Sequence, residues 1–235
     1  KGGLTLRNIW RGAISFGLVN VPIKLYTAVE NRDIHFSLLH SACQTPIKYH
    51  QRCPNCEQDL SKEEIIRGYE YEKGRFVIIR DEDLEGIAAE KSKTIDIIDF
   101  VNLAEIDPIY FHRSYFLAPA EGGQKAYALL RQAMENTARI AIARVVIRAK
   151  ESLAAIRVYK QGLIMETIYY PEEIRSIDLV PELQTEVSLK EKELEMAESL
   201  IASLTTRFEP EKYTNEYRQA VRELIEAKVQ GQEIV

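Results

Sequence analysis

The stretch from Ile9 to Tyr26 constrains the fold more than any other part of the chain, because it reads as two strands joined by a tight bend. The apolar face of the first strand consists of Trp10, Ile14, Phe16 and Leu18. Small or basic residues, Arg11 among them, fall on the other face, as in a strand with one buried side. Asn20 and Pro22 then interrupt the ladder, because proline donates no backbone hydrogen bond. The alternation resumes up to Leu25, so the stretch predicts a strand pair in a sheet or barrel.

Length and composition agree with a folded core. The chain has 235 residues, of which 46% are hydrophobic and 29% are charged, as is usual for a globular protein with a sizeable core. No apolar run approaches the roughly 18 residues that a membrane span needs. No signal peptide precedes the first strand. We therefore expect a cytoplasmic protein without a membrane partner.

Charge is segregated along the sequence. The formal net charge of -5 argues at first against nucleic acid, because duplex binding depends on cations that meet phosphates. However, residues 1–56 carry seven Lys or Arg against two acids, and residues 131–160 also carry seven against two. Residues 57–107 carry seven against fifteen. A folded chain can therefore present one basic surface while its acids lie elsewhere.

The three cysteines and three of the four histidines lie close together in the sequence. His40-x2-Cys43 and Cys53-x2-Cys56, nine residues apart, have the spacing of a zinc ribbon, in which each pair ligates from one tight turn. The spacing predicts a structural, four-coordinate zinc site. His35 and His50 are rival fourth ligands, and His40 is preferred because it alone has the two-residue spacing to a cysteine.

Two other interpretations of the cysteines compete with zinc. Cys53-Pro54-Asn55-Cys56 matches a thiol redox motif, but such motifs follow the first strand of a βαβ unit, which this sequence does not predict here. The thiols can also remain unligated in a reducing cytosol. We expect a zinc site rather than a redox motif or unligated thiols.

The middle of the chain alternates between helix and strand signals. A capping box predicts a short helix over residues 61–67, and strands are expected over 75–80 and 94–101 with a helix at 81–88 between them. A further strand covers 110–119, and a helix covers 124–139, with its apolar stripe at Ala126, Leu130, Ala133 and Thr137. We expect the carboxylates Asp96 and Asp99 to lie on a solvated strand face. We expect His112 to be a hydrogen-bonded strand residue and not a catalyst. No grouping typical of a hydrolytic enzyme can be drawn.

Three strands, over residues 140–150, 153–159 and 163–170, end the predicted core. The turn Lys160-Gln161-Gly162 joins the last two, with glycine where a positive φ is expected. Arg144 and Arg148 share one strand face at roughly 13 Å, and could reach separate phosphates. The candidate phosphate contacts, chosen by local charge and strand position, are Arg11, Lys24, Arg131, Arg139, Arg144, Arg148, Arg157 and Lys160.

The exact residue sequence of the first strand pair is more informative than its hydrophobic periodicity. W-R-G-x-I-S-F-G-L-V-N-V-P-I-K-L-Y closely resembles the opening of the core of bacterial Ku, the homodimeric DNA-end-binding protein of non-homologous end joining. The block ARVVIRAKESLAAIRVYKQGLIMETIYYPEEIR, far along the chain, resembles the same core. The resemblance implies a β-barrel, a ring-shaped dimer that threads duplex DNA, no catalytic activity, and a ligase partner. It permits zinc without requiring it.

Together these features predict a mixed α+β protein. A Ku-type β-barrel core covers about residues 4–180 with a zinc-ribbon-like insertion at 40–56, and a C-terminal helical arm covers 187–230. The arm is indicated by an apolar stripe at Leu194, Ala197, Ile201 and Leu204. The expected function is sequence-independent binding of double-stranded DNA ends as a homodimer, in the nucleoid, with recruitment of an ATP-dependent DNA ligase. The alternatives are an end-processing nuclease or lyase and a zinc-ribbon protein adaptor.

Overall fold

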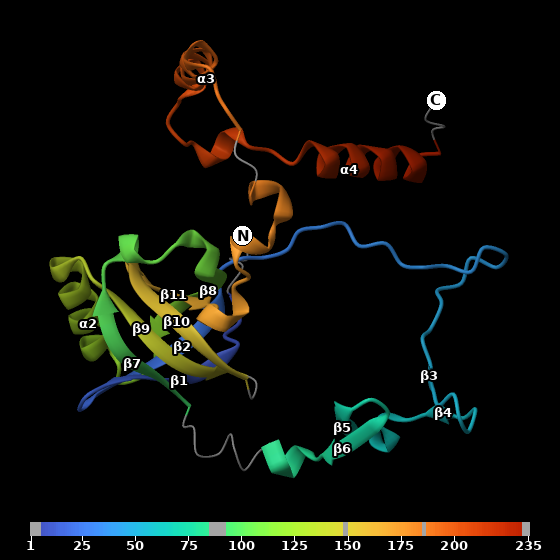
Figure 1. Ribbon diagram of the computed structural model, residues 1–235. Coiled ribbons are helices and arrows are strands. Elements are labelled where there is room, and N and C mark those ends of the chain that lie inside the picture. Colours follow the sequence, from blue (N-terminus) through green and yellow to red (C-terminus); the bar gives the residue numbers. More distant parts are fainter. Residues whose placement is uncertain (1–5, 85–92, 148–149, 185–186, 232–235) are drawn as a thin grey trace. The chain divides into compact units, whose positions relative to one another are not determined.

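The computed structural model describes residues 6–84, 93–147, 150–184 and 187–231 (Figure 1). The chain divides into two compact units. One consists of residues 1–30 and 48–174, and the other of residues 31–47 and 175–235. Each unit is described by itself.

The first unit contains a closed barrel of seven strands, in the order β1-β2-β8-β11-β10-β9-β7. The strands are β1 (Trp10–Phe16), β2 (Val19–Thr27), β7 (Thr94–Val101), β8 (Phe111–Pro119), β9 (Ile140–Ile147), β10 (Lys150–Tyr159) and β11 (Gly162–Ile168). Neighbours are antiparallel except β1 and β7, whose parallel pairing closes the barrel. The mixed α+β class with a barrel core is therefore confirmed.

The barrel interior is filled by alternate residues of every strand. Ile14, Ile23, Ile156 and Met165 are fully buried there, because successive side chains of a strand point to opposite faces. The helix α2 (Gln124–Thr137) adds its own side chains to this core. They are Tyr127, Leu130 and Met134. The predicted stripe of this helix was wrong except at Leu130 and the partly buried Ala126, since Ala133 and Thr137 are exposed.

The bend of the first strand pair lies earlier than predicted. Gly17 and Leu18 form the turn between β1 and β2, and Leu18 is fully exposed. Pro22 does not interrupt the ladder; it lies inside β2 opposite Ala13. The Pro22 carbonyl accepts a hydrogen bond from the Ala120 amide at 2.9 Å. Proline is tolerated here because its missing N–H is not needed for this contact.

Two small ribbons lie outside the barrel. The strands β3 (Gln51–Arg52) and β4 (Asp59–Leu60) form one ribbon, and β5 (Arg67–Glu72) and β6 (Arg75–Ile79) form the other. The sequence missed β5, and the helix predicted over 61–67 is only a 3₁₀ turn, η1 (Lys62–Glu64). Residues 81–84 begin the helix predicted at 81–88, whose remainder lies outside the described residues.

Short 3₁₀ helices connect the remaining elements. They are η2 (Leu103–Glu105), η3 (Pro108–Tyr110), η4 (Pro171–Glu173), η5 (Ile177–Leu179), η6 (Pro181–Gln184) and η7 (Pro210–Lys212). In the second unit the long helices are α3 (Glu191–Leu204) and α4 (Glu216–Val229). In the parts of the chain that the structure describes, no helix has the length and apolar character to cross a membrane.

Candidate nucleic-acid interface

Arg11 and Lys24 are direct cross-strand neighbours on β1 and β2. The residues beside Lys24, Ile23 and Leu25, are fully buried in the barrel, so Lys24 and its partner point outward. Like charges placed directly opposite each other destabilise a sheet. No ion pair with a carboxylate is found for either cation among the described residues. The barrel exterior therefore carries a cation pair that an anion would stabilise.

A hollow of about 480 Å³ is lined by residues of β8, of α2 and of the turn between β10 and β11. Lys24 lies opposite Ala118 of β8. Ala118 in turn lies next to Gly162, because the ladder between β8 and β11 pairs Leu117 with Leu163. Two small residues thus stand side by side where larger side chains would fill the space. The residues that line the hollow include Phe116, Ala118, Pro119, Tyr127, Tyr159 and Lys160.

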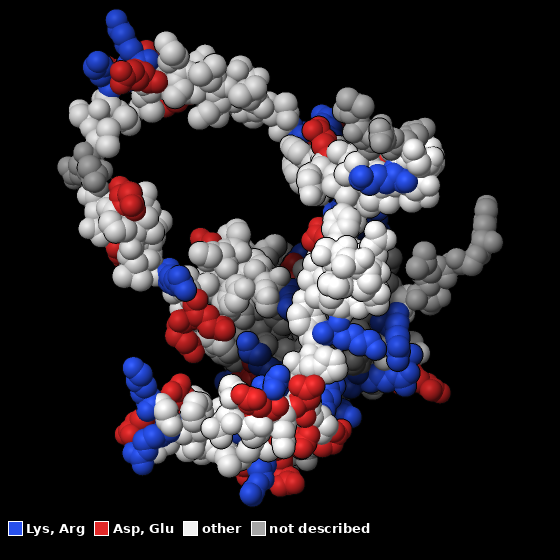
Figure 2. All heavy atoms as spheres, turned by 90° about the vertical axis from the view of Figure 1, so that its right-hand side faces the viewer, with Lys and Arg blue, Asp and Glu red and all other residues white. Residues whose placement is uncertain are grey.

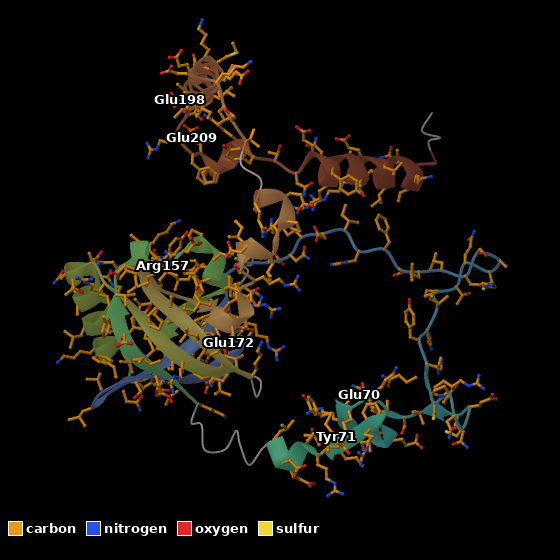
Figure 3. The ribbon with its side chains drawn as sticks, viewed as in Figure 1. Glu70, Tyr71, Arg157, Glu172, Glu198 and Glu209 are labelled. Carbon is orange, nitrogen blue, oxygen red and sulfur yellow. The ribbon has the colours of Figure 1, made fainter. Side chains whose placement is uncertain are left out.

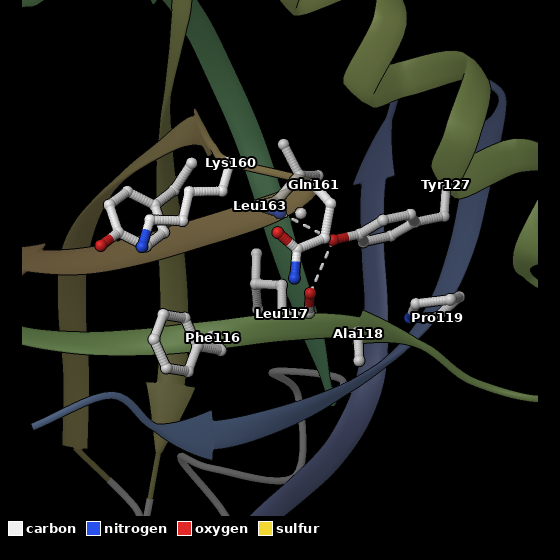
Figure 4. A pocket seen from close by; sticks show the side chains of 10 residues that line it. Phe116, Leu117, Ala118, Pro119, Tyr127, Lys160, Gln161 and Leu163 are labelled. Atoms are coloured by element: carbon white, nitrogen blue, oxygen red, sulfur yellow. Dashed lines mark hydrogen bonds between the residues drawn. The ribbon is translucent and has the colours of Figure 1, made fainter.

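Tyr127 forms the back of the hollow (Figure 4). Its hydroxyl donates to the Leu117 carbonyl at 2.6 Å and accepts from the Leu163 amide at 2.7 Å. The side chain thus reaches from α2 to the place where β8 and β11 separate. Burial raises the pKa of Tyr127 above its ordinary value, so the hydroxyl stays protonated and can make both bonds. The back of the hollow has no free polar group at this point.

Aromatic rings and cations form the side of the hollow. The rings of Phe116 and Tyr159 are stacked, with centroids 6.1 Å apart and an interplanar angle of 23°. The Lys160 ammonium lies 5.4 Å from the Tyr159 centroid, and the Arg157 guanidinium lies 5.7 Å from it. Such contacts fix both the cations and the ring. Tyr159 and Lys160 are exposed.

Lys160 has a left-handed backbone, with φ of +51°. The positive φ of this turn was predicted at Gly162, but Gly162 already pairs with Tyr159 in the ladder. The turn therefore consists of Lys160 and Gln161, and the lysine adopts the conformation that favours glycine. This conformation costs roughly 1–2 kcal/mol for a residue with a Cβ atom. Such strain is frequent at functional sites.

Arg157 extends from the barrel wall (Figure 3) but is already paired. Its Nε lies 2.8 Å from Glu166 Oε2, and its Nη2 donates to Glu166 Oε1 at 3.3 Å. The Ser114 hydroxyl also donates to Glu166, whose side chain is only 14% exposed. Arg157 would contact a phosphate only if this half-buried pair opened or shared its charge.

The other predicted contacts are dispersed. Arg131 of α2 pairs with Glu135 at 3.0 Å, and Arg139 is exposed beyond the end of that helix. Arg144 is exposed on β9 opposite Asp96 of β7. Arg148 lies outside the described residues. Of the predicted set, only Lys160 lines the hollow. Lys24 is the cross-strand neighbour of the lining residue Ala118, and Arg157 lies over the ring of the lining residue Tyr159. Arg11 lies one strand further away, opposite Lys24.

The cysteine pairs form two turns of similar construction. His40 Nδ1 lies 3.0 Å from Cys43 Sγ, and the residue after Cys43 has φ of +54°. Between β3 and β4, the residue after Cys56 has φ of +52°, and the Cys53 amide donates to the Gln58 carbonyl at 2.9 Å. Hydrogen bonds from Thr45 and then His40 lower the pKa of Cys43 to about 7. Hydrogen bonds from Cys56 lower the pKa of Cys53. Both turns therefore favour thiolates.

The described residues do not gather the predicted zinc ligands into one group. Over residues 6–84, 93–147, 150–184 and 187–231, no three His, Cys, Asp or Glu side chains form a group that could hold a metal ion. His40 and Cys43 belong to one compact unit, and Cys53 and Cys56 belong to the other. Of the rival ligands, His50 lies 3.9 Å from Asp59 across the small ribbon, and His35 is exposed.

A comparison with protein-family models identifies the type of barrel. The Ku model, described as the Ku70/Ku80 beta-barrel domain, matches residues 15–196. The chain belongs to the Ku family. The predicted resemblance is thereby confirmed, and it covers the barrel as well as the part of the chain that follows it.

Several curated Ku proteins are similar over nearly the whole chain. The Non-homologous end joining protein Ku of Heliobacterium modesticaldum is 53% identical over 99% of this chain and 84% of its own length. That of Bacillus subtilis is 49% identical over 99% of this chain and 75% of its own length. That of Symbiobacterium thermophilum is 52% identical over 96% of this chain but only 56% of its own length.

Sequence reasoning missed the apolar part of this Ku surface. The types and spacing of Phe116, Tyr127 and Tyr159 are typical of core residues, so the sequence does not single them out as surface residues. The available signal was the pair of small residues, Ala118 and Gly162, but their adjacency follows from a strand register that only the folded barrel defines.

Proposed function

We propose that this chain binds the ends of double-stranded DNA without sequence preference, as a homodimeric ring that acts in non-homologous end joining. The observation that carries the proposal is the cation pair Arg11 and Lys24 on the exterior of a Ku barrel, for which the described part of the chain provides no carboxylate partner. Phosphates are the anions that such a pair recognises without reading sequence. The relatives' shared name, Non-homologous end joining protein Ku, supports the pathway.

The second unit supports a dimer. None of its described residues is buried, although α3 and α4 carry exposed apolar side chains such as Leu194, Ile201 and Leu224. A segment without a core cannot repay the entropy of its own folding. We infer that a second copy of the chain covers these surfaces.

The hairpin of β5 and β6 supports the same inference. Every described residue of the hairpin is exposed except Ile79, which is half-buried. Tyr69 and Val77 are cross-strand partners, with 68% and 47% of their surfaces exposed. The hairpin side chains, Glu70 and Tyr71 among them, are drawn in Figure 3. An isolated two-stranded hairpin is only marginally stable in water, so it too needs a covering partner.

One face of the molecule carries side chains of both charges. On the face drawn in Figure 2, cationic and anionic side chains occur in mixed groups. We propose that retention on DNA depends on a few well-placed cations and on a topological link. A ring supplies such a link.

The ring is tested by the topology of the DNA. Protein is loaded on linear duplex, both ends are blocked with bulky protein caps, and retention is measured after a high-salt wash. Salt weakens phosphate contacts, so we expect loss from uncapped DNA and retention on capped DNA, with poor binding to a closed circle of the same sequence. Equal binding to the circle, or equal loss from capped and uncapped DNA, would show a groove binder instead.

The enzyme and adaptor alternatives give different results in one gel shift. Blunt linear duplex is incubated with the protein, with and without magnesium. We expect a stable shift and intact DNA in both cases. Cleavage would show an end-processing nuclease or lyase, and the absence of any shift would favour a protein adaptor.

We also propose a structural zinc ion bound by His40, Cys43, Cys53 and Cys56. The two turns and the lowered thiol pKa values support this donor set, because zinc binds thiolates and neutral imidazole. Zinc would cross-link two short segments that have little core of their own.

Metal analysis tests the zinc site. Protein purified in reducing buffer without added zinc is expected to contain about one ion per chain, and Cys53→Ser is expected to lose it. His50→Ala and His35→Ala serve as controls that keep the metal. Absence of metal from freshly purified, reduced protein would remove zinc from the proposal.

The proposal extends to an ATP-dependent DNA ligase that the loaded ring recruits, and to action at the nucleoid in the cytoplasm. Pull-down of the purified ligase by DNA-loaded protein, compared with unloaded protein, tests the partner. We expect recovery of the ligase with the loaded protein only.

A further inference from the structure

We propose that Cys53 and Cys56 are an oxidative modification site, at which a peroxide closes a reversible disulfide within the turn between β3 and β4. The disulfide depends only on this turn and on its two thiols. Its consequence for metal binding rests on the proposed zinc site, because the same two cysteines belong to the proposed zinc ligands.

The turn brings the two thiols together. Residues 54–56 form the turn, so Cys53 is its first residue and Cys56 its fourth. The first and fourth α-carbons of such a turn lie within about 7 Å, and disulfides join α-carbons that are roughly 4.4–6.8 Å apart. Pro54 fixes the φ angle that the second position of a common turn requires. The two sulfur atoms can therefore bond with little movement of the backbone.

Two hydrogen bonds close the base of the turn. The Cys53 amide donates to the Gln58 carbonyl at 2.9 Å. The Arg52 Nε donates to the Glu57 carbonyl at 3.0 Å, and the Arg52 guanidinium lies 3.6 Å from the Glu57 carboxylate. These contacts hold the chain on both sides of the thiol pair. Little further loop-closure entropy is therefore lost when the disulfide forms.

The thiols are accessible to a small oxidant. Both are free, and Cys56 is exposed while Cys53 is half-buried. A hydrogen bond from the Cys56 backbone lowers the pKa of Cys53, which favours the Cys53 thiolate as the attacking group. The surrounding β3–β4 ribbon is two-stranded and lacks the βαβ unit of thiol oxidoreductases. The pair is therefore a target of oxidation and not the active site of such an enzyme.

The reaction balances with hydrogen peroxide as the oxidant. The Cys53 sulfur bonds to one peroxide oxygen, the O–O bond breaks, and the departing oxygen takes the proton that Cys53 had released and leaves as water. The Cys56 thiol then attacks this sulfenic acid. An S–S bond forms, the S–O bond breaks, and the oxygen leaves with the Cys56 proton as a second water. Two thiols thus lose two electrons, and one peroxide becomes two waters.

The other cysteine turn cannot react in this way. Its base is closed similarly, by the His40 amide that donates to the Thr45 carbonyl at 3.0 Å, but a histidine stands at its first position. Cys43 therefore has no second thiol in its own turn. Zinc binds thiolates and not disulfide sulfur, so oxidation of one turn removes two of the four proposed ligands. The two that remain are fewer than a structural zinc site requires.

Peptide mapping after peroxide treatment tests the pair. Reduced protein is treated with hydrogen peroxide, quenched with catalase, unfolded, alkylated with iodoacetamide and digested with trypsin, which leaves both thiols in the peptide of residues 53–62. We expect this peptide to lose the mass of two hydrogen atoms and to resist alkylation, while Cys43 is alkylated. Dithiothreitol before alkylation should restore both thiols. A chromogenic chelator should report the loss of about one zinc ion per chain.

Three variants separate the disulfide from the zinc site. His40→Ala and Cys43→Ser each lack one proposed zinc ligand but keep the reacting turn, so both should form the disulfide without releasing zinc. Cys56→Ser should stop at the Cys53 sulfenic acid, which dimedone labels. Thermal unfolding confirms that each variant keeps the folded barrel. A wild type that contains no zinc but forms the disulfide would remove zinc from the proposed function and support the present inference.

The contribution of the turn is measured in His40→Ala, where zinc does not protect the thiols. We expect the folded variant to form the disulfide faster than the same variant in concentrated urea, because the turn holds the thiols close together. Equal rates would overturn the inference. It would also be overturned if both thiols of wild type stayed alkylatable, if they became sulfinic acids without a disulfide, or if the disulfide joined Cys43 or a second chain.

Discussion

At the scale of single residues, Arg11 and Lys24 show a conflict between stability and binding. Their opposed like charges weaken the barrel wall in the free protein. Arg11→Glu converts the pair to opposite charges. We expect this change to raise the free energy of unfolding by roughly 0.2–1 kcal/mol and to weaken DNA binding at the same time. Denaturant unfolding and a salt titration of blunt-duplex binding measure the two effects.

The double variant Arg11→Glu with Lys24→Glu separates these effects. It restores a like-charged pair, so stability returns toward that of the wild type, while two phosphate contacts are lost. The slope of log affinity against log salt should flatten by about 1.8. The matched control, Lys48→Glu with Lys62→Glu, changes the net charge equally on exposed lysines that belong neither to the barrel strands nor to the β5–β6 hairpin. An equal change of slope in the control would show that net charge alone is responsible.

Lys160 poses the same conflict in its backbone. Lys160→Gly removes the cost of a left-handed residue with a Cβ atom, so we expect a gain of about 1 kcal/mol in the free energy of unfolding. It also removes a cation and weakens DNA binding. Lys160→Gln keeps the strained backbone and loses only the charge, so it should weaken binding without stabilising the fold. A destabilised Lys160→Gly variant would contradict the strain argument.

At the scale of elements, the β1–β2 hairpin depends on two glycines for different reasons. A Cβ atom on Gly12 would collide with the Trp10 ring and with the Lys93 carbonyl. That carbonyl accepts a hydrogen bond from the Ala13 amide at 3.1 Å, so it cannot withdraw without disturbing the closure of the barrel. Gly17 has φ of +55° in the turn but meets no atom within 4 Å.

Gly12→Ala is therefore expected to cost about 3 kcal/mol or more of unfolding free energy, at the upper end for overpacking. Gly17→Asn is the control at the other end of the same strand, and it should cost less than about 1 kcal/mol because asparagine tolerates this backbone. Denaturant midpoints of both variants give the comparison. Equal losses would show that the closure at Gly12 adapts more easily than its geometry indicates.

At the scale of the whole molecule, apolar surface left uncovered by one chain predicts a dimer. Light scattering should give twice the 27.0 kDa mass of one chain. Tyr69→Asp with Val77→Asp places two charges on an exposed apolar face of the β5–β6 hairpin. We expect these charges to weaken or abolish the dimer and to remove retention on capped DNA, while the barrel keeps its thermal transition.

The control for the hairpin variant adds the same charges at exposed positions of α2, as Gln132→Asp with Asn136→Asp. This protein should remain dimeric. A hairpin variant that stays dimeric at micromolar concentration would show that other surfaces hold the two copies together.

Much of the barrel could be predicted from the sequence, because alternation along a strand depends only on local backbone geometry. The inward positions Trp10, Ile14 and Phe16 were predicted correctly. The two-residue spacing within His40–Cys43 and within Cys53–Cys56 predicted two turns that the structure contains. The sequence pattern predicts the interruption at Asn20 and Pro22 rather than the bend at Gly17, because proline is rare inside strands. The residue sequence from Ile9 to Tyr26 also predicted the Ku family.

Tertiary structure alone decided which residues meet across strands. The pairing of Arg157 with Glu166, the opposition of Arg11 and Lys24, and the reach of Tyr127 to Leu163 all depend on the register and closure of the barrel. Residue types and local spacing do not define that register, because a shift of one residue would turn every side chain to the opposite face. The sequence by itself therefore determined most strands of the barrel, the two turns that contain the cysteines, and the number of cationic side chains. The closed barrel determined which cations stay unpaired and where the hollow forms, because both depend on neighbours that are distant along the chain.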